Sequence, residues 1–150
     1  MATTTPMSLK GRALRLLSAR EHSRAELERK LAQFEEEPGA LAKALDDLQA
    51  KGFINEQRVL ESVLNRRSAK LGTARIRQEL QSKGLAPEAV LDAMEQLRAT
   101  EVERAREVWR KKFGEPATDA SDRAKQMRFL ASRGFGGEAI RRVVTSSEDE

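Results

Sequence analysis

The side chains of this sequence best suited to chemistry are basic, and they gather near the expected ends of helices. One predicted contact patch spans a short turn and comprises Arg66, Arg67, Lys70, Arg75 and Arg77. Further along the chain, a second predicted patch comprises Arg110, Lys111 and Lys112, with Arg141 and Arg142 as additional contact residues. Arginine suits carboxylate and phosphate because its fork of N–H groups bonds both oxygens at once. The alternative is that these residues are ordinary solvated surface charge.

The positive charge is unevenly distributed along the chain. The 150 residues hold 28 Lys and Arg against 24 Asp and Glu, a formal net charge of +4. Residues 55–85 and residues 101–142 each carry an excess of four positive charges, whereas residues 86–100 and 143–150 are acidic. This layout suits a nucleic acid or an acidic protein surface as the partner.

Signals for catalysis, metals or cofactors are weak. The absence of Cys excludes disulfides, Cys-ligated zinc and thiol nucleophiles. The one histidine, His22, lies beside an expected helix cap, where a local hydrogen-bonding role is predicted. There is no phosphate-binding loop, nucleophile elbow or His-Glu-x-x-His motif. We expect neither enzyme activity nor a cofactor or metal, and a hydrolase or nuclease is the least favoured function.

Other charged residues fit helix stabilisation better than chemistry. Glu26 with Lys30, and Glu107 with Lys111, are four residues apart, which predicts exposed ion pairs along helices. The chain has no run of roughly 20 apolar residues that could span a membrane, and its start lacks a signal-peptide core. We therefore expect a cytoplasmic protein without membrane contact.

Composition and periodicity predict an all-α protein. Ala, Leu, Glu, Lys, Arg and Gln dominate, and all of them favour helices. Apolar residues recur at helical spacing, as in Leu41, Leu45 and Leu48. Ser23 with Glu26, and Thr100 with Glu103, fit the capping box that begins a helix. Other predicted helix starts are Asn55 and Asp122 as N-caps and Pro87 as a first helical residue.

A recurring signature, Leu-x-x-(Lys/Arg)-Gly-(Phe/Leu), is expected to end three helices. It occurs at residues 48–53, 80–85 and 130–135. With Gly in the left-handed conformation, the apolar residue after it can fold back onto the Leu. We therefore expect Phe53 and Phe135, with Phe129, in the core, and Trp109 as a core anchor. This leaves few aromatic residues on which single-stranded nucleic acid could stack.

A degenerate repeat of about fifty residues organises the helices. The expected parts are a flexible N-terminal segment at 1–7, three-helix repeats at 8–54, 55–100 and 101–145, and an acidic tail at 146–150. One such repeat buries little apolar surface, so neighbours should stack and share a core that includes Leu80. The prediction is an elongated, curved array, right-angled or solenoid-like.

Four segments together resemble the bacterial RecX family. They are residues 13–17 with 20–27, residues 72–80 with Lys83-Gly84, residues 109–114, and residues 128–135. The likeness spans about residues 8–144 and departs at Phe34–Gly39, where the family more often has a basic-Gly-aromatic turn. It implies three tandem three-helix repeats, a cytoplasmic location and no catalytic residues.

The resemblance also implies a partner. Proteins of this family modulate RecA recombinase, usually by lodging in the groove of the RecA–DNA filament. They oppose filament growth, ATP hydrolysis, strand exchange and co-protease function. We expect a monomer that binds the RecA nucleoprotein filament, with weak direct DNA contact. The alternative from charge and helical composition is a stand-alone basic helical DNA-binding module.

Overall fold

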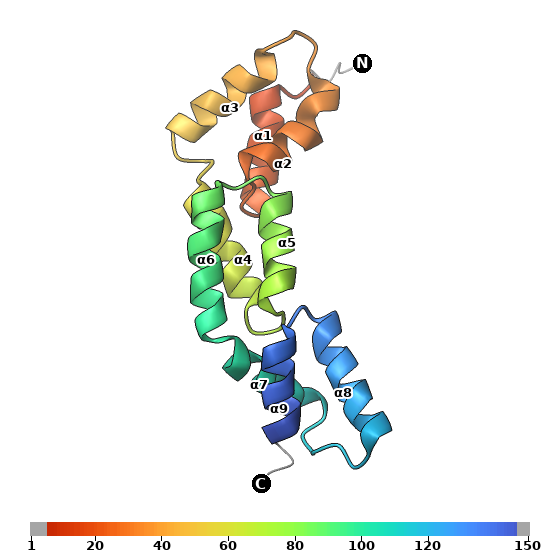
Figure 1. Cartoon of the computed structure of the whole chain (residues 1–150). Coiled ribbons are helices and arrows are strands. Elements are labelled where there is room, and N and C mark those ends of the chain that lie inside the picture. Colours follow the sequence, from red (N-terminus) through yellow and green to blue (C-terminus); the bar gives the residue numbers. More distant parts are fainter. Residues whose placement is uncertain (1–5, 147–150) are drawn as a thin grey trace. The chain divides into compact units, whose positions relative to one another are not determined.

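Helices account for nearly all regular structure in residues 6–146, the part of the chain that this computed structural model describes (Figure 1). The elements are α1 (Leu9–Ala19), α2 (Arg24–Leu31), η1 (a 3₁₀ helix, Ala32–Phe34), α3 (Ala40–Ala50), α4 (Glu56–Arg67), α5 (Thr73–Ser82), α6 (Pro87–Ala99), α7 (Glu101–Lys112), α8 (Ala120–Ser132) and α9 (Gly137–Ser146). These residues contain no strand, so the all-α prediction is confirmed. None of their helices is long and apolar enough to cross a membrane. Most of the expected flexible N-terminal segment and acidic tail lies outside the described residues.

Three predicted helix starts are confirmed. The Ser23 hydroxyl accepts the Glu26 N–H at 3.1 Å, and the Glu26 carboxylate accepts the Ser23 N–H at 3.1 Å, which completes a capping box before α2. Asn55 Oδ1 accepts the Arg58 N–H at 3.0 Å before α4. Pro87 is the first residue of α6, where its missing N–H has no intrahelical partner to lose.

A fourth predicted start, Thr100, is correct in position, since Thr100 is the N-cap residue of α7. Its predicted capping box with Glu103 is wrong, because the Thr100 hydroxyl donates to the Leu97 carbonyl and accepts from Arg104. The predicted cap at Asp122 is also wrong. Helix α8 begins earlier than expected, at Ala120, and Asp119 is its N-cap, accepting the Asp122 N–H at 2.7 Å. Asp122 therefore lies inside the first turn of α8, where its carboxylate accepts the Thr118 N–H at 3.3 Å.

Two of the predicted glycine-ended turns can be compared directly. Gly52 and Gly134 have φ of +84° and +93°, and the Phe after each donates its N–H to the carbonyl of the signature Leu, at 2.9 Å from Phe53 and 3.2 Å from Phe135. The third glycine, Gly84, has φ of +67°, so all three left-handed predictions are confirmed. The core prediction is correct for Phe135, which is 4% exposed, and wrong for Phe53, which is 47% exposed.

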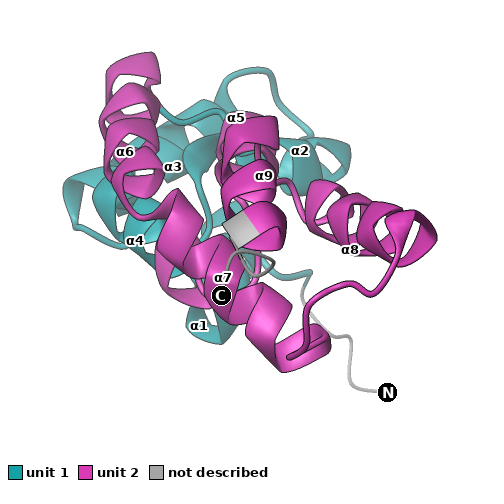
Figure 2. Ribbon diagram, turned by 60° about the horizontal axis from the view of Figure 1, so that its bottom comes forward, with its two compact units in different colours: residues 1–62, 83–85 teal, residues 63–82, 86–150 magenta. Residues whose placement is uncertain are grey.

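The chain divides into two compact units (Figure 2). Unit 1 is residues 1–62 with 83–85, and unit 2 is residues 63–82 with 86–150, so α4 contributes residues to both. In unit 1, α1, α2 and α3 pack against one another around a core that includes Leu27, Leu45 and Leu48.

In unit 2, α7, α8 and α9 pack together around an apolar core, and α5 packs on α6. Trp109 is buried in this core, as predicted, and its Nε1 donates to Gln126 Oε1 at 2.9 Å. The Gln126 amide in turn donates to the Glu115 carbonyl, so the buried polar groups are paired. Leu80 is fully buried, as expected. Phe129 is half-buried and packs against the same core.

Candidate partner-binding surface

The first predicted patch lies at the end of α4 and the beginning of α5. Arg66, Lys70 and Arg77 are exposed, and none of the three forms an ion pair with another residue in 6–146. Arg67 is different, because its Nε lies 3.5 Å from Glu79 Oε1 on α5 and part of its charge is compensated within the fold. The exposed members of this patch therefore have side chains available to an anionic partner.

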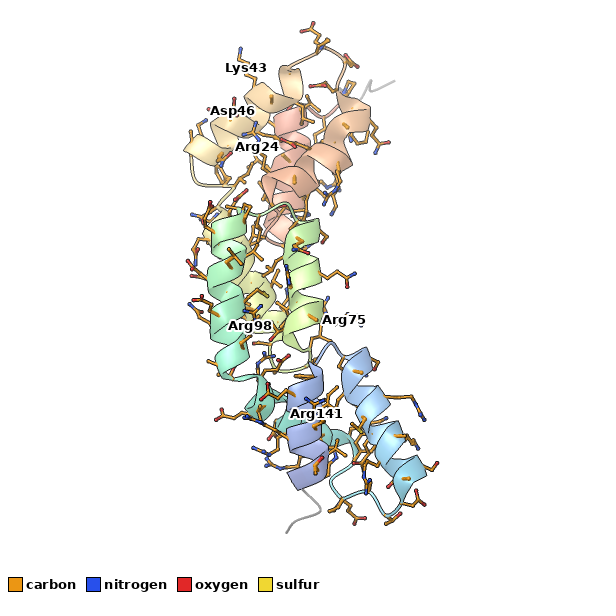
Figure 3. All side chains as sticks on the ribbon, in the orientation of Figure 1. Arg24, Lys43, Asp46, Arg75, Arg98 and Arg141 are labelled. Carbon is orange, nitrogen blue, oxygen red and sulfur yellow. The ribbon has the colours of Figure 1, made fainter. Side chains whose placement is uncertain are left out.

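Arg75, the fifth member, is engaged by the fold itself. It lies at the end of α5 that adjoins α8, and its guanidinium donates to the Ser132 carbonyl at 2.9 Å (Figure 3). The last carbonyls of a helix lack intrahelical donors, so this bond satisfies one of them at the end of α8. Arg75 thus joins α5 to α8 as well as carrying a charge.

A contact between two glycines fixes the same junction, which the sequence did not indicate. The Gly72 N–H donates to the Arg133 carbonyl at 2.8 Å, and the Ala74 N–H donates to the Gly134 carbonyl at 3.2 Å. A Cβ on Gly72 would lie 2.3 Å from the Gly134 carbonyl carbon, and a Cβ on Gly134 would lie 2.7 Å from the Arg75 nitrogen. No other residue type allows so close an approach of two backbones.

Arg104 on α7 holds the turn after α4 in place. Its guanidinium donates to the carbonyls of Ser68 at 3.1 Å, Leu71 at 2.7 Å and Leu97 at 2.9 Å. It also donates to the hydroxyls of Thr73 and Thr100. Burial lowers the pKa of Arg104, and an arginine guanidinium remains protonated in proteins. This side chain brings residues 68–71 against α7.

In the second predicted patch, on α7, some positive charges are paired with carboxylates and others are not. Arg110 pairs with Glu107 at 2.6 Å, so the predicted pair between Glu107 and Lys111 is wrong. Lys111 is exposed and forms no ion pair within the described chain.

The additional contact residues on α9 also differ from each other. Arg142 pairs with Glu138 at 3.0 Å across one turn of the helix. Arg141 is exposed on α9 (Figure 3), and among residues 6–146 it has no carboxylate partner.

The structure brings Lys70 of the first patch together with Lys111 and Lys112 of the second. They surround an open cavity of about 350 Å³ in unit 2, called here the cationic pocket. Its lining is Ala69, Lys70, Val108, Lys111, Lys112, Phe129 and Arg133. Four of these seven residues are cationic and none is acidic. The sequence predicted two separate patches here, because the Arg104 bonds that join them have no sequence signature.

The aromatic ring in the pocket already has charged neighbours. The Arg133 guanidinium lies 4.9 Å from the centre of the Phe129 ring, and the Lys112 ammonium lies 5.3 Å from it. Both distances fit cation–π attraction. Phe113 packs edge-on against the same ring, with centroids 5.5 Å apart and planes at 86°. These contacts place two of the four cations at the pocket.

Unit 1 also has a basic surface cavity, of about 380 Å³, which the sequence analysis missed. Its lining is Met7, Arg12, Arg15, Leu16, Lys30, Leu31 and Phe34. The Arg12 guanidinium lies 3.7 Å from the centre of the Phe34 ring, which is 38% exposed. Of residues 34–39, where the sequence departs from the expected turn, Phe34 alone is in this lining.

A buried ionic cluster in unit 1 replaces the predicted surface pair of Glu26 with Lys30. The Glu26 carboxylate accepts from Arg20 at 2.8 Å and from Lys83 at 3.1 Å, and it also caps α2. Burial would raise the pKa of Glu26, but the hydrogen bonds from Arg20, the Ser23 N–H and Lys83 outweigh burial and lower it from 4.5 to about 2. Glu26 is therefore a structural anion.

His22 has the local role that was predicted. It is 2% exposed, its Nδ1 lies 3.0 Å from the Arg20 carbonyl, and its Nε2 lies 3.1 Å from Lys30 Nζ. Burial lowers the pKa of His22, and the charges of Arg20 and Lys30 lower it further, although the hydrogen bond to the Arg20 carbonyl acts in the opposite direction. Lys30 thus contacts His22 and not Glu26. Groups of three or more potential metal ligands are absent from residues 6–146.

Comparison with known proteins identifies the family. Models of the first, second and third three-helix domains of RecX match residues 10–48, 55–94 and 99–144, in that order along the chain. The chain belongs to the RecX family. Its fold is accordingly three tandem three-helix domains, as the resemblance implied.

Named relatives and solved structures agree with this assignment. The chain is 53% identical to the regulatory protein RecX of Leptothrix cholodnii, with 100% of this chain and 96% of the relative aligned. It is 50% identical to the regulatory protein RecX of Herminiimonas arsenicoxydans, with 95% of each aligned. The crystal structure of RecX from Lactobacillus salivarius matches with a TM-score of 0.78 at 20% identity, over 95% of this chain and 96% of that one. A crystal structure of regulatory protein RecX matches with a TM-score of 0.72 at 19% identity, over 92% and 71%.

Proposed function

We propose that this chain binds the filament of RecA recombinase on DNA, in the filament groove, and inhibits it. The inhibited activities are filament growth, ATP hydrolysis, strand exchange and co-protease function. Membership of a family of regulatory proteins supports the proposal, as does the set of exposed cations without internal acidic partners. The chain acts in the cytoplasm as a monomer and has no catalytic role.

The proposed contact residues are the ten basic residues of the two patches and α9. They are Arg66, Arg67, Lys70, Arg75, Arg77, Arg110, Lys111, Lys112, Arg141 and Arg142. Those without an internal ion pair can give their full charge to the partner, and Arg66 and Arg77 are two such residues on neighbouring helices. A charge that is already compensated contributes less to binding, because its partner must be displaced or shared.

The test is inhibition of RecA ATPase on single-stranded DNA by a charge-reversed variant. We expect R66E/R77E to need at least about tenfold more protein for half-inhibition, since two favourable contacts become repulsive. The matched control is R98E/K125E, which makes the same change in net charge at two other exposed positions. It should stay within about twofold of the unmodified chain.

Circular dichroism should show the same helicity for all three proteins. Inhibition by R66E/R77E at unmodified strength would remove these residues from the contact surface. If neither the unmodified chain nor any variant inhibits RecA ATPase at any concentration, the proposed function itself is refuted.

A further inference from the structure

The cationic pocket concentrates charge of a single sign. Its cations come from the turn after α4, the end of α7 and the end of α8, and its lining contains no carboxylate. Four positive charges around one cavity of about 350 Å³ repel one another, so an anionic occupant would relieve this repulsion. Charge complementarity therefore favours a negatively charged partner group at the pocket rim.

The pocket is also held in shape before any partner arrives. Arg104 fixes the turn that carries Ala69 and Lys70 through bonds to the Ser68 and Leu71 carbonyls. The Phe129 ring is fixed by Phe113 edge-on and by the two cations above it. A preformed cavity avoids part of the ordering cost of binding.

The apolar part of the lining suits an aliphatic or aromatic side chain better than a nucleobase. Apart from the cations, the lining is Ala69, Val108 and Phe129, with no amide, hydroxyl or carboxyl side chain to read a base edge. The lining offers a single aromatic ring, whereas proteins that bind single strands stack successive bases on several rings. The cavity volume, at the small end of ligand pockets, fits one large side chain.

We propose that the cationic pocket binds an acidic peptide segment of a partner protein, which inserts one large apolar side chain between Val108 and Phe129. Carboxylates that flank this side chain pair with Lys70, Lys111 and Lys112 at the rim. The inference rests on the proposed function in one respect, that these lysines are contact residues. It adds the kind of partner group that they contact.

The experiment measures peptide binding to the full chain by fluorescence anisotropy, with neither RecA nor DNA present. The probe is a fluorescein-labelled ten-residue peptide of Asp and Glu with one central Phe. A second peptide has Ser in place of Phe and the same charge, and a third probe is labelled oligothymidylate. At about 0.1 M salt we expect the Phe peptide to bind at least about tenfold more tightly than the Ser peptide.

Two variants separate the charged and the apolar contributions. K111E/K112E should weaken binding of both peptides by at least about tenfold, whereas R98E/K125E, with the same change in charge, should stay within about twofold. A69W fills the cavity from an exposed position and should bind both peptides equally. A99W, at another exposed position, should retain the preference for Phe.

Equal binding of the Phe and Ser peptides to the unmodified chain would overturn the proposal. Peptide binding that is unchanged in K111E/K112E would also overturn it. A third contrary result is that the chain binds oligothymidylate but neither peptide, and loses this binding in both K111E/K112E and A69W. The pocket would then be a nucleic-acid site. Because no RecA is present, a failure here leaves the ATPase test of the proposed function unaffected. A failure of the ATPase test likewise leaves the peptide result standing.

Discussion

The turns that end α3 and α8 share a sequence signature and a backbone, yet they bury their phenylalanines to very different extents. Gly52 and Gly134 both have left-handed φ, and both turns close with the same hydrogen bond to the signature Leu. Phe53 in unit 1 is 47% exposed, whereas Phe135 in unit 2 is 4% exposed.

The difference lies in what surrounds each turn. A Cβ on Gly52 would meet nothing within 4 Å, whereas Gly134 lies against the start of α5. The local sequence therefore determines the shape of the turn, and the packing of other segments determines whether its apolar residue is buried. A glycine-ended helix can be predicted locally, but the core cannot.

The largest expected contrast is between the two phenylalanines. F135A should lower the free energy of unfolding by about 3–5 kcal/mol, because it removes a buried aromatic side chain from the core of unit 2. F53A should cost no more than about 0.5 kcal/mol, as for other exposed positions. Urea unfolding measures both, and similar losses at the two positions would refute the difference in burial.

The two glycines provide a second, smaller contrast. G134A should cost about 3 kcal/mol, because alanine is strained at this φ and its Cβ would lie 2.7 Å from the Arg75 nitrogen. G52A carries only the strain and should cost about 1 kcal/mol. The comparison fails if both variants lose the same stability in thermal or urea unfolding.

The basic residue of the signature differs between copies as well. Lys51 forms a surface pair with Asp47 at 3.1 Å, whereas Lys83 is buried against Glu26. The buried pair makes part of the stability of unit 1 dependent on pH. Because the folded-state pKa of Glu26, about 2, lies below its ordinary value of 4.5, its contribution is complete above about pH 5 and is lost as the pH falls toward 2.

The third and smallest predicted effect, that of E26Q on the free energy of unfolding, tests this pH dependence. E26Q should lower the free energy of unfolding by about 2 kcal/mol at pH 7, and its difference from the unmodified chain should shrink as the pH falls from about 5 to 2.5. E28Q, which removes an exposed pair with Arg24, should change stability by less than about 0.5 kcal/mol at any pH. A gap between E26Q and the unmodified chain that stays constant in acid would contradict the ionic role of Glu26.

Much of the fold could be predicted from the sequence because its signals are local. Helical periodicity, the Ser23 capping box, Pro87 and the left-handed glycines each act within one or two turns. The sequence predictions are wrong where the sequence offers two candidate N-caps, as at Asp119 and Asp122, or where a residue pairs with one far away in the sequence. Lys83 is fifty-seven positions from Glu26, and no local pattern could reveal that pair.

The sequence predicted which residues belong to the candidate site, but it did not predict how they are arranged. Clusters of basic residues identified Lys70, Lys111 and Lys112, but their convergence depends on Arg104 and on the contact between Gly72 and Gly134. Both are contacts between residues far apart in the sequence, and no motif around Arg104 or Gly72 indicates them. The sequence could therefore propose candidate charges, and the structure shows which of them face the same cavity.

The most direct test of the account is a titration of this chain against two DNA substrates at the same salt concentration, one coated with RecA and one bare. We predict tight binding to the RecA-coated strand and binding at least about tenfold weaker to the bare strand, because the proposed partner is the nucleoprotein filament and direct contact with DNA is weak. Equal or tighter binding to bare DNA would contradict the account and favour a DNA-binding module that acts without RecA.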